Sequence, residues 1–409
     1  MVEQRYFAAV AVALLLLETF LCLFIVSKVP YTEIDWEAYM SEVAGPFKYG
    51  DFNYENLEGA TGPLVYPAGF VYLYGILYYV TGEGVDIPTA QYIFVGLYIS
   101  FLAIVAYIMK RTRMFPPWML FLLSLSRRCH SLFMLRLFND CWAMFALYLS
   151  VALFCNRRWL SGSFVFSLAV SVKMNILLFA PGLLLLLVHE YGVFGCVLPL
   201  SICAGVQIFL AIPFLQVNWL GYLKRSFNIG RVFMYKWSVN FQFLSEETFV
   251  SKELAVGLLV LTVGLLCLLC VKKWSLHLRK FQWISRDTTP VLHPAYIVAV
   301  LFSSNFAGIV CARSLHYQFY SWYFHQIPFL TLLWPSGTLF SLGRIVLLGA
   351  VEVVWNVYPP NATASLVLQI CHALLFLGIL YGEFPQPYLK GHRAREIGTA
   401  EDGKRRKVA

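Results

Sequence analysis

Apolar runs long enough to form membrane-spanning helices recur along this sequence from about residue 6 to about residue 382. A helix needs about 20 apolar residues to cross the hydrocarbon core of a bilayer. Charged residues make up 13% of the 409 residues, against about 25% in a soluble globular domain. Continuous apolar runs favour helices over the short alternating strands of a membrane barrel. The sequence therefore predicts an all-α fold, a polytopic membrane helical bundle. It would form one integral membrane domain over residues 1–383, followed by a polar cytoplasmic tail over residues 384–409.

Short clusters of Lys and Arg between the apolar runs predict the orientation of the chain, because such clusters remain in the cytoplasm. They occur at residues 110–113, 156–158, 272–273, 279–280 and 404–407. All of them are cytoplasmic if crossings lie near 6–27, 90–109, 115–135, 140–156, 160–173, 175–189, 192–214, 253–271, 293–311, 327–342, 343–358 and 364–382. This arrangement of about twelve transmembrane helices puts both termini in the cytoplasm and the glycosylation sequon at Asn361 on the opposite side.

This topology requires that the apolar stretch 64–80 does not cross the membrane. The stretch is short, rich in tyrosine and preceded or interrupted by Pro63 and Pro67. Prolines prevent a regular helix start, and tyrosines favour the membrane–water interface. We therefore expect a helix that dips into the non-cytoplasmic face, within a large first loop over residues 28–89. An ordinary short transmembrane helix is the alternative.

Carboxylates gather in the segment YTEIDWEAY, residues 31–39, directly after the first apolar run. A carboxylate close to the membrane exit is partly desolvated, which raises its pKa and makes it a better base. Glu33 and Asp35 are accordingly both candidates for a catalytic base. The aromatic side chains of Trp36 and Tyr39 offer stacking surfaces, and the proline-rich turn can present Tyr66 to the same site.

Other segments expected on the same side of the membrane carry cations and aromatic residues. We predict that four of these residues bind a phosphate group: Arg313, His316, Tyr317 and Arg231. Three further residues are expected to contact sugars, together with Trp36, Tyr39 and Tyr66: Asn139, Asp140 and Trp237. Arg136 precedes Asn139, and Lys173 interrupts an apolar run; ionisable residues at membrane depth are functional by default, although both can instead be long side chains that reach the interface from a helix end.

A set of cations facing a set of carboxylates suits a site for a lipid-linked phosphate, because Arg matches phosphate geometry. A carboxylate can deprotonate the hydroxyl that attacks the sugar of such a carrier. Glycoside hydrolysis by inversion also needs a carboxylic acid to protonate the leaving oxygen, but a phosphate leaves as a stable anion. No His, Asp and Glu set has metal-ligand spacing, so no divalent metal or other cofactor is expected. No nucleic-acid-binding motif is present.

The sequence resembles one known family, in order, from about residue 30 to residue 382. Seven stretches carry the resemblance: EIDWEAYM, TGPLVYPAGFVYLY, LRLFND, SLAVSVKMNILLFAPGLL, SVNFQFL, LFSSNFAGI and RSLHYQFYSWYFHQIP. The family is the dolichyl-phosphate-mannose-dependent α-1,3-mannosyltransferases of lipid-linked oligosaccharide assembly. The resemblance implies a GT-C glycosyltransferase fold, inverting transfer of mannose without a metal, and Asp35 as the family's catalytic Asp. Glu33 is then a neighbour that tunes the pKa of Asp35. It also implies a dolichyl-phosphate-mannose donor and a Man5GlcNAc2 acceptor on dolichyl pyrophosphate. The reaction would occur on the luminal side of the endoplasmic reticulum membrane, in N-glycan precursor synthesis. Cys141 stands where the family usually has Pro.

Other functions remain open from the residues alone. One is a transferase of the same fold that takes another sugar from a polyprenyl phosphate. A second is a transporter or flippase for a lipid-linked sugar. A transporter typically shows repeats with paired broken helices and charges near the bilayer midplane, whereas this chain concentrates its charges at one face. A structural membrane subunit is the third alternative, and it leaves the Arg313 and His316 cluster without a role.

Overall fold

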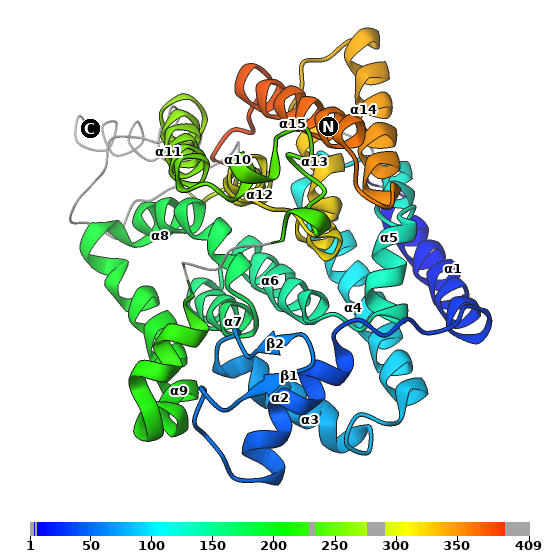
Figure 1. Cartoon of the computed structure of the whole chain (residues 1–409). Coiled ribbons are helices and arrows are strands. Elements are labelled where there is room, and N and C mark those ends of the chain that lie inside the picture. Colours follow the sequence, from blue (N-terminus) through cyan, green and yellow to red (C-terminus); the bar gives the residue numbers. More distant parts are fainter. Residues whose placement is uncertain (1–3, 5, 229–233, 276–290, 389–409) are drawn as a thin grey trace.

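The computed structural model describes residues 4, 6–228, 234–275 and 291–388, in which almost all regular structure is helical (Figure 1). The two strands among these residues, β1 (Glu58–Gly59) and β2 (Gly62–Pro63), form a small antiparallel hairpin. The all-α prediction is confirmed. The predicted tail lies outside the described residues from position 389 onward, as do residues 279–280.

The longer helices are α1 (Phe7–Lys28), α2 (Trp36–Lys48), α3 (Ala68–Val80), α4 (Ile87–Thr112), α6 (Asn139–Cys155), α7 (Trp159–Val172), α8 (Ala180–Gly195), α9 (Val197–Ser226), α11 (Lys252–Leu269), α12 (Pro294–Val310), α14 (Thr338–Asn356) and α15 (Ala362–Tyr381). Shorter α-helices are α5 (Arg127–His130), α10 (Glu246–Val250) and α13 (Ile327–Thr331). Short 3-10 or π turns are η1 (Pro117–Leu123), η2 (Ser131–Leu135), η3 (Met174–Phe179), η4 (Tyr235–Trp237), η5 (Cys270–Trp274), η6 (Tyr317–Trp322) and η7 (Phe324–Gln326).

In the described residues, seven helices are long and apolar enough to cross a membrane, or eight if the bent pair 127–135 and 139–155 counts as one span. This confirms a polytopic membrane protein. Several of the twelve expected crossings are realised as shorter or bent segments: the stretches near 160–173 and 293–311 form helices of 14 and 17 residues. The stretch near 327–342 contains only the five-residue helix α13 before the chain turns into α14. Apolar composition identified these stretches but did not predict where their helices stop.

The interior of the bundle is formed by α6, α7 and α12, with α4 beside them, while α1 and α9 lie at opposite edges (Figure 1). Nearly every residue of α12 is buried. By contrast, α1 is mostly exposed: in an 18-residue stretch of it that is apolar enough to cross a membrane, 17% is buried. A helix that is apolar all round and packs on one side only suits a lipid-facing position, so α1 fits the perimeter of a membrane bundle.

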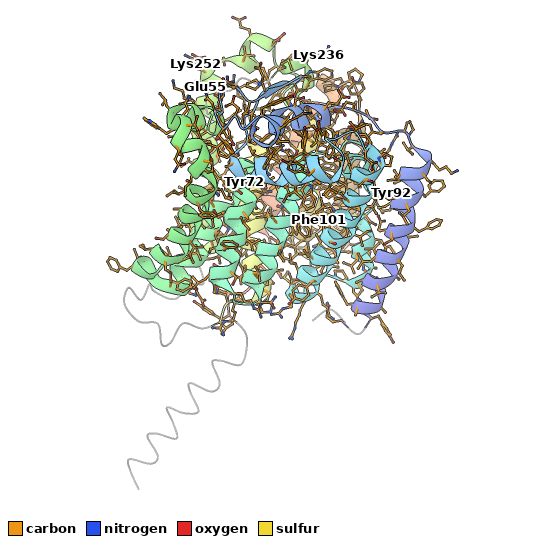
Figure 2. All side chains as sticks on the ribbon, turned by 90° about the horizontal axis from the view of Figure 1, so that it is seen from below. Glu55, Tyr72, Tyr92, Phe101, Lys236 and Lys252 are labelled. Carbon is orange, nitrogen blue, oxygen red and sulfur yellow. The ribbon has the colours of Figure 1, made fainter. Side chains whose placement is uncertain are left out.

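The bundle has two distinct ends. One end carries α2 and the β1–β2 hairpin, and Glu55, Lys236 and Lys252 lie there (Figure 2); we call it the Asp35 end. At the opposite end, Arg111 donates to the carbonyl of Cys155 at 3.0 Å, and Tyr107 donates to Asn156 at 2.8 Å. The basic clusters 110–113 and 156–158 therefore lie together, as a shared cytoplasmic side requires.

Helix α3 begins and ends at the Asp35 end. Before it, the ring of Tyr66 lies 5.9 Å from the ring of Tyr39. After it, the carbonyl of Gly84 accepts a hydrogen bond from the Trp36 indole at 2.9 Å. The helix has 13 residues, about 20 Å at 1.5 Å per residue, against a hydrocarbon core of about 30 Å. This geometry supports the prediction that α3 does not cross.

Thiol labelling at the two ends of α4 tests this topology. Val85, 82% exposed, precedes α4, and the exposed Lys110 lies in its last turn. In sealed vesicles with the cytoplasmic face outward, we expect a membrane-impermeant thiol reagent to modify Lys110→Cys and to modify Val85→Cys only after permeabilisation. The unsubstituted protein provides the background from its ten native cysteines. The reverse pattern would make α3 a full span.

Candidate active site

Asp35 immediately precedes α2, but its side chain does not cap that helix. Glu33 takes this role instead, since its Oε1 accepts from the backbone N–H of Glu37 at 3.1 Å and its Oε2 accepts from the hydroxyl of Tyr31. The Asp35 carboxylate accepts from the Tyr39 hydroxyl at 3.2 Å, one helical turn further on. Glu33 thus satisfies the start of the helix, and the half-buried Asp35 is left to face the interior.

A chain of polar contacts extends inward from Tyr39. Its hydroxyl also lies 3.4 Å from Oδ1 of Asn139, so its single proton is shared between that atom and Asp35. The ammonium of Lys173 donates to Oδ1 of Asn139 at 2.9 Å and to Oδ2 of Asp140 at 2.6 Å. The indole N–H of Trp322 donates to the other carboxylate oxygen of Asp140. We call Asp35, Tyr39, Asn139, Asp140 and Lys173 the polar chain.

A helix break places Lys173 in the polar chain. Helix α7 ends at Val172, and Lys173 has extended backbone angles, with φ −157° and ψ 130°. Its side chain is buried, and the ammonium lies 5.4 Å from the ring centre of Tyr66 and 5.7 Å from that of Phe319. Asp140 lies in the first turn of α6 and is fully buried, where the partial positive charge of a helix N-terminus favours a carboxylate.

Burial raises the pKa of Asp35, and this is the largest influence on it. The positive charge of Lys173 and the hydrogen bond from Tyr39 oppose the rise, while the negative charges of Asp140 and Glu33 add to it. A raised pKa means that the ionised carboxylate takes up a proton more readily. Asp35 is therefore a stronger base than an aspartate in water.

Asn139 has a buried amide nitrogen, Nδ2, with no hydrogen-bond partner among the described residues. Leaving a buried donor unsatisfied costs about 1–3 kcal/mol. A ligand oxygen that reached this position would remove the cost. The predicted sugar contacts of Tyr39, Tyr66, Asn139 and Asp140 thus concern residues that the structure brings together around Asp35, and the sugar-binding role itself stays a prediction.

Trp36 and Trp237 are not part of the polar chain. Trp36 is fully buried, packs against Tyr74 and Phe94, and donates to Gly84; its position supports α2 more directly than it offers a stacking face. Trp237 lies in η4, where the ammonium of Lys236 stands 4.9 Å from its ring. The contacts of both residues are thus made outside the polar chain, and their sugar-binding roles remain predictions.

The predicted phosphate-binding residues that the structure describes each make contacts within the protein. Arg313 donates to the carbonyls of Phe249 and Val250, at 3.4 and 2.6 Å, at the end of α10. The ring of His316 stacks on that of Phe319, with 5.4 Å between the ring centres. Phe319 is also the ring that lies near the ammonium of Lys173. Tyr317 donates to the carbonyl of Val357 at 2.6 Å. Arg231 lies outside the described residues. The role of these four residues in binding phosphate stays a prediction.

The segment of Arg313 is held by the preceding SVN motif. Asn240 donates to the carbonyl of Ala312 and accepts from the N–H of Leu315, both at 2.7 Å. Val239 donates to the carbonyl of Leu315 at 2.7 Å. These bonds fix residues 312–315 against residues 238–240.

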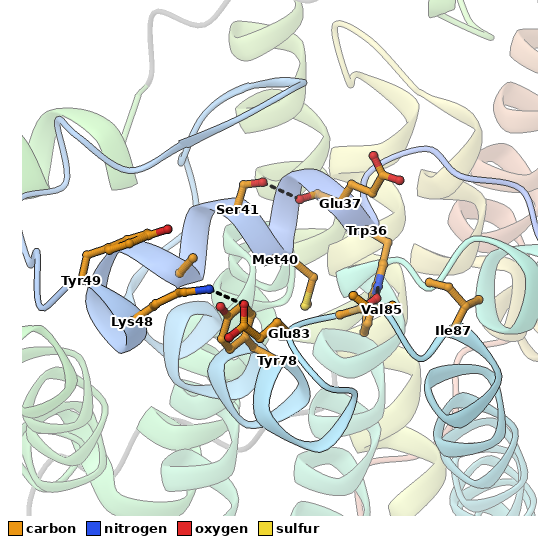
Figure 3. A pocket seen from close by; sticks show the side chains of 12 residues that line it. Trp36, Glu37, Met40, Ser41, Lys48, Tyr49, Tyr78, Glu83, Val85 and Ile87 are labelled. Atoms are coloured by element: carbon orange, nitrogen blue, oxygen red, sulfur yellow. Dashed lines mark hydrogen bonds and ion pairs between the residues drawn. The ribbon is translucent and has the colours of Figure 1, made fainter.

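The outer face of α2 carries a pocket of about 490 Å³ (Figure 3). It runs from Trp36 and Glu37, directly after Asp35, to Tyr49, and the ion pair between Lys48 and Glu83, at 2.5 Å, lies along it. The pocket and the polar chain therefore lie against different faces of the same helix. The pocket is open, and Lys48 and Glu83 along it are paired with each other.

A second buried polar group links α1 to α5. Glu18 and His130 are hydrogen-bonded at 2.8 Å, and Cys22 completes a set of three ligand atoms within 4.8 Å of one another. Glu, Cys and His are suitable ligands for zinc. His130 also contacts the carbonyl of Ser126 through Nδ1 at 2.7 Å, so both of its nitrogens already have partners within the protein. None of the three residues belongs to the polar chain.

Sequence reasoning identified Asp35 and Asp140 but not the groups that connect them. Lys173 was recognised only as a charge in an apolar run, and Trp322 only as part of an aromatic cluster. A lysine that interrupts the segment LAVSVKMNILLF was the available signal, because a charge at that depth requires a partner. Nothing in the sequence indicated which acid it pairs with.

The fold and the polar chain define a class: helical membrane proteins that hold a partly desolvated carboxylate at one end of the bundle, near a buried lysine. Comparison with known proteins narrows this class. The family described as ALG3 protein matches residues 12–365. The chain is 46% identical over 395 residues to the Homo sapiens protein named Dol-P-Man:Man(5)GlcNAc(2)-PP-Dol alpha-1,3-mannosyltransferase, covering 95% of this chain and 90% of the relative.

Proteins with the same name in Mus musculus and Arabidopsis thaliana are 44% and 45% identical, each over 95% of this chain and over 92% and 91% of their own lengths. The chain belongs to the ALG3 protein family. The resemblance to the dolichyl-phosphate-mannose-dependent α-1,3-mannosyltransferases is confirmed, and it extends over nearly the whole chain.

Proposed function

We propose that this chain transfers mannose from dolichyl-phosphate-mannose to Man5GlcNAc2 on dolichyl pyrophosphate, forming an α-1,3 linkage with inversion, with Asp35 as the general base. The substrates are those in the names of its relatives. The observation that carries the residue assignment is the position of Asp35: half-buried, turned inward from the start of α2, and bonded to Tyr39 rather than to the helix N-terminus.

In this mechanism Asp35 removes the proton from the attacking 3-hydroxyl of the acceptor mannose. The oxygen attacks the anomeric carbon of the donor mannose from the face opposite the phosphate, so one C–O bond forms as the other breaks and the configuration inverts. The electron pair of the broken bond leaves with dolichyl phosphate. A neighbouring cation stabilises the negative charge that grows on this group in the transition state.

Tyr39 and Asn139 are proposed to orient the base and the sugar. The Tyr39 hydroxyl holds one oxygen of Asp35, which leaves the second oxygen for the acceptor hydroxyl. The amide nitrogen of Asn139, unpartnered among the described residues, is available to a sugar oxygen. Lys173 is neutralised by Asp140 and shapes the wall of the site.

The Asp35 end is proposed to face the lumen of the endoplasmic reticulum, with both termini in the cytoplasm. The basic residues at the opposite end of α4 and α6 support this orientation. The region 28–89 would then be the luminal part that carries the base. The reaction is proposed to use no divalent metal, because the leaving phosphate is already a stable anion that Arg and His side chains can neutralise.

Purified protein with a short polyprenyl-phosphate-mannose and a synthetic Man5GlcNAc2 pyrophosphate lipid tests the reaction. We expect formation of Man6GlcNAc2, with the new mannose removable by an α-1,3-specific mannosidase, and we expect the rate to persist in excess EDTA. Polyprenyl-phosphate-glucose serves as the matched alternative donor.

Transfer from the glucose donor alone would establish the alternative transferase of the same fold. Loss of activity in EDTA, restored by Mn²⁺ or Mg²⁺, would contradict the metal-independent mechanism. A chelated sample that is returned to buffer without metal and retains its activity controls for damage by the chelator.

A further inference from the structure

Three arginines lie close together where the chain enters α6. The segment formed by α5 and η2 meets α6 at an angle of 109°. It carries Arg127 and Arg128 in its first turn, and Arg136 follows its last residue. Because of the bend, this segment runs across the direction of α6, and it presents its arginines at the edge of the bundle. The mechanism proposed above leaves this cluster without a role.

The three guanidinium groups are near enough for their charges to act on one another: that of Arg128 with those of Arg136 and Arg127, and that of Arg136 with that of Arg127. The Arg136 guanidinium folds back and donates to the hydroxyl of Ser131. Ser131 is four residues after Arg127, and residues four apart lie one above the other on a helix, about 5–6 Å apart between Cβ atoms. Arg136 is thereby held about one turn from Arg127 and Arg128.

Arg128 is fixed by two neighbouring elements. Its Nε donates to the carbonyl of Trp355 at 3.1 Å, at the end of α14, and its guanidinium lies 4.4 Å from the centre of the Tyr317 ring. Tyr317 is one of the residues predicted to bind phosphate, and its contact with Arg128 places it beside the cluster. Because Nε carries the bond to the protein, the Nη groups of Arg128 remain available to a ligand.

None of the ion pairs in the part of the chain that the structure describes includes any of the three arginines. The nearest acidic influence on Arg128 is the charge of Glu352. Glu352, on neighbouring α14, instead accepts hydrogen bonds from Tyr320 at 2.9 Å and from Asn356 at 2.8 Å. Three like charges held together repel one another. A bound anion would relieve that repulsion.

The cluster lies at the Asp35 end. The carbonyl of Leu135, next to Arg136, accepts a hydrogen bond from the N–H of Thr32 at 2.9 Å. Thr32 is three residues before Asp35, and Asn139 of the polar chain is three residues after Arg136. Arg127 and the nearby Leu125 are exposed, so the cluster can be reached from the perimeter of the bundle, which in a membrane is occupied by lipid.

We propose that Arg127, Arg128 and Arg136 bind the phosphate of a polyprenyl carrier lipid as it enters the active site from the membrane. The inference rests on the proposed function for the identity of the carrier. Arg forks match phosphate oxygens and remain charged. The shared chemistry is a lipid phosphate ester, which can belong to the donor monophosphate or to the acceptor diphosphate. Arg313 is already bonded to two carbonyls, so this cluster offers phosphate more unsatisfied donors.

Binding of unreactive carriers to the purified full-length protein tests the inference separately from turnover. The probes are citronellyl phosphate, citronellyl diphosphate and dioctanoyl phosphatidylglycerol. The variants are Arg127→Gln and Arg136→Gln, and Arg111→Gln, at the opposite end of the bundle, is the matched control. Loss of one hydrogen-bonded charge typically weakens binding about 10- to 100-fold. We expect such a loss for citronellyl phosphate or its diphosphate in both cluster variants, and unchanged binding in Arg111→Gln.

The phosphate that is affected identifies the substrate. If the arginines bind the donor, weaker binding of citronellyl phosphate should be accompanied by a rise of about tenfold or more in the KM for the mannose donor. If they bind the acceptor, weaker binding of citronellyl diphosphate should be accompanied by a rise in the KM for the acceptor. Arg127 is exposed, so Arg127→Gln is expected to fold normally, and its thermal unfolding midpoint provides the check.

Two outcomes would overturn the inference: unchanged carrier binding in folded Arg127→Gln and Arg136→Gln, or weaker binding of phosphatidylglycerol alone. If both variants weaken carrier binding as expected but the unsubstituted protein transfers no mannose, the proposed function is refuted and the phosphate site stands.

Discussion

Replacing Asp35 by Asn is expected to reduce the turnover of mannose transfer by about two to four orders of magnitude, because removing a general base typically costs that much. Asn has nearly the same shape and can still accept the Tyr39 hydrogen bond, which is 3.2 Å long in the structure. It cannot take up the proton of the attacking hydroxyl. The loss should therefore appear in kcat, while the KM for the donor changes little.

The thermal stability of the Asp35→Asn variant, unlike its turnover, should not fall. Burial raises the pKa of Asp35 in the folded protein, which means that folding favours the protonated form over the ionised form. The stabilising contribution of this group is present at low pH and is lost as the pH rises through the raised folded-state pKa. At neutral pH the carboxylate is a net cost, so Asp35→Asn is expected to unfold at the same temperature as the unsubstituted protein or at a higher one.

Two controls make the result specific. Glu33→Gln changes the neighbouring carboxylate, which serves the start of α2, and should reduce kcat much less than Asp35→Asn. The acid limb of the pH profile of kcat/KM should lie above the pKa of about 3.9 that an aspartate has in a peptide. Near-normal turnover in a folded Asp35→Asn protein would exclude Asp35 as the base and direct attention to Asp140.

The sequence was sufficient to predict the fold class and to single out Asp35 as a candidate. Apolar runs and basic clusters follow from the requirements of a bilayer on any chain, so the helical bundle and the shared end of residues 110–113 and 156–158 were predictable. Asp35 stood out because it follows the first membrane helix and lies in a motif of the family. Both predictions depend on local patterns, and local patterns are visible in one sequence.

Contacts between distant segments were not predictable. The partner of Lys173 depends on how α7 ends and on how α6 begins, and the two paired residues are 33 positions apart. The environment of Arg313 was hidden for the same reason: an arginine in an aromatic segment suggested phosphate, and nothing local indicated that α10 supplies two carbonyls that bind it. The arginines at 127 and 128 were overlooked because the stretch 115–135 was interpreted as a single straight span.

The buried ion pair between Lys173 and Asp140 should be the most sensitive polar contact for stability. The two residues are 8% and 0% exposed, and their charged atoms are 2.6 Å apart. Removing one member of such a pair leaves an uncompensated buried charge, at a cost of about 3–5 kcal/mol. Lys173→Met keeps most of the length of the side chain and removes the charge, so it is expected to destabilise the protein by that amount.

The double variant Lys173→Met with Asp140→Asn separates charge from packing. It removes both charges, so no buried charge is left unpaired, and it should recover much of the stability that Lys173→Met loses. Lys48→Met is the matched control, because Lys48 pairs with Glu83 in an exposed position and exposed pairs contribute little. Thermal unfolding in detergent should rank Lys173→Met well below the double variant, and Lys48→Met close to the unsubstituted protein. Equal losses in Lys173→Met and in the double variant would show that Lys173 stabilises the fold through its packing against Tyr66 and Phe319, and that the charge of Asp140 is accommodated without it.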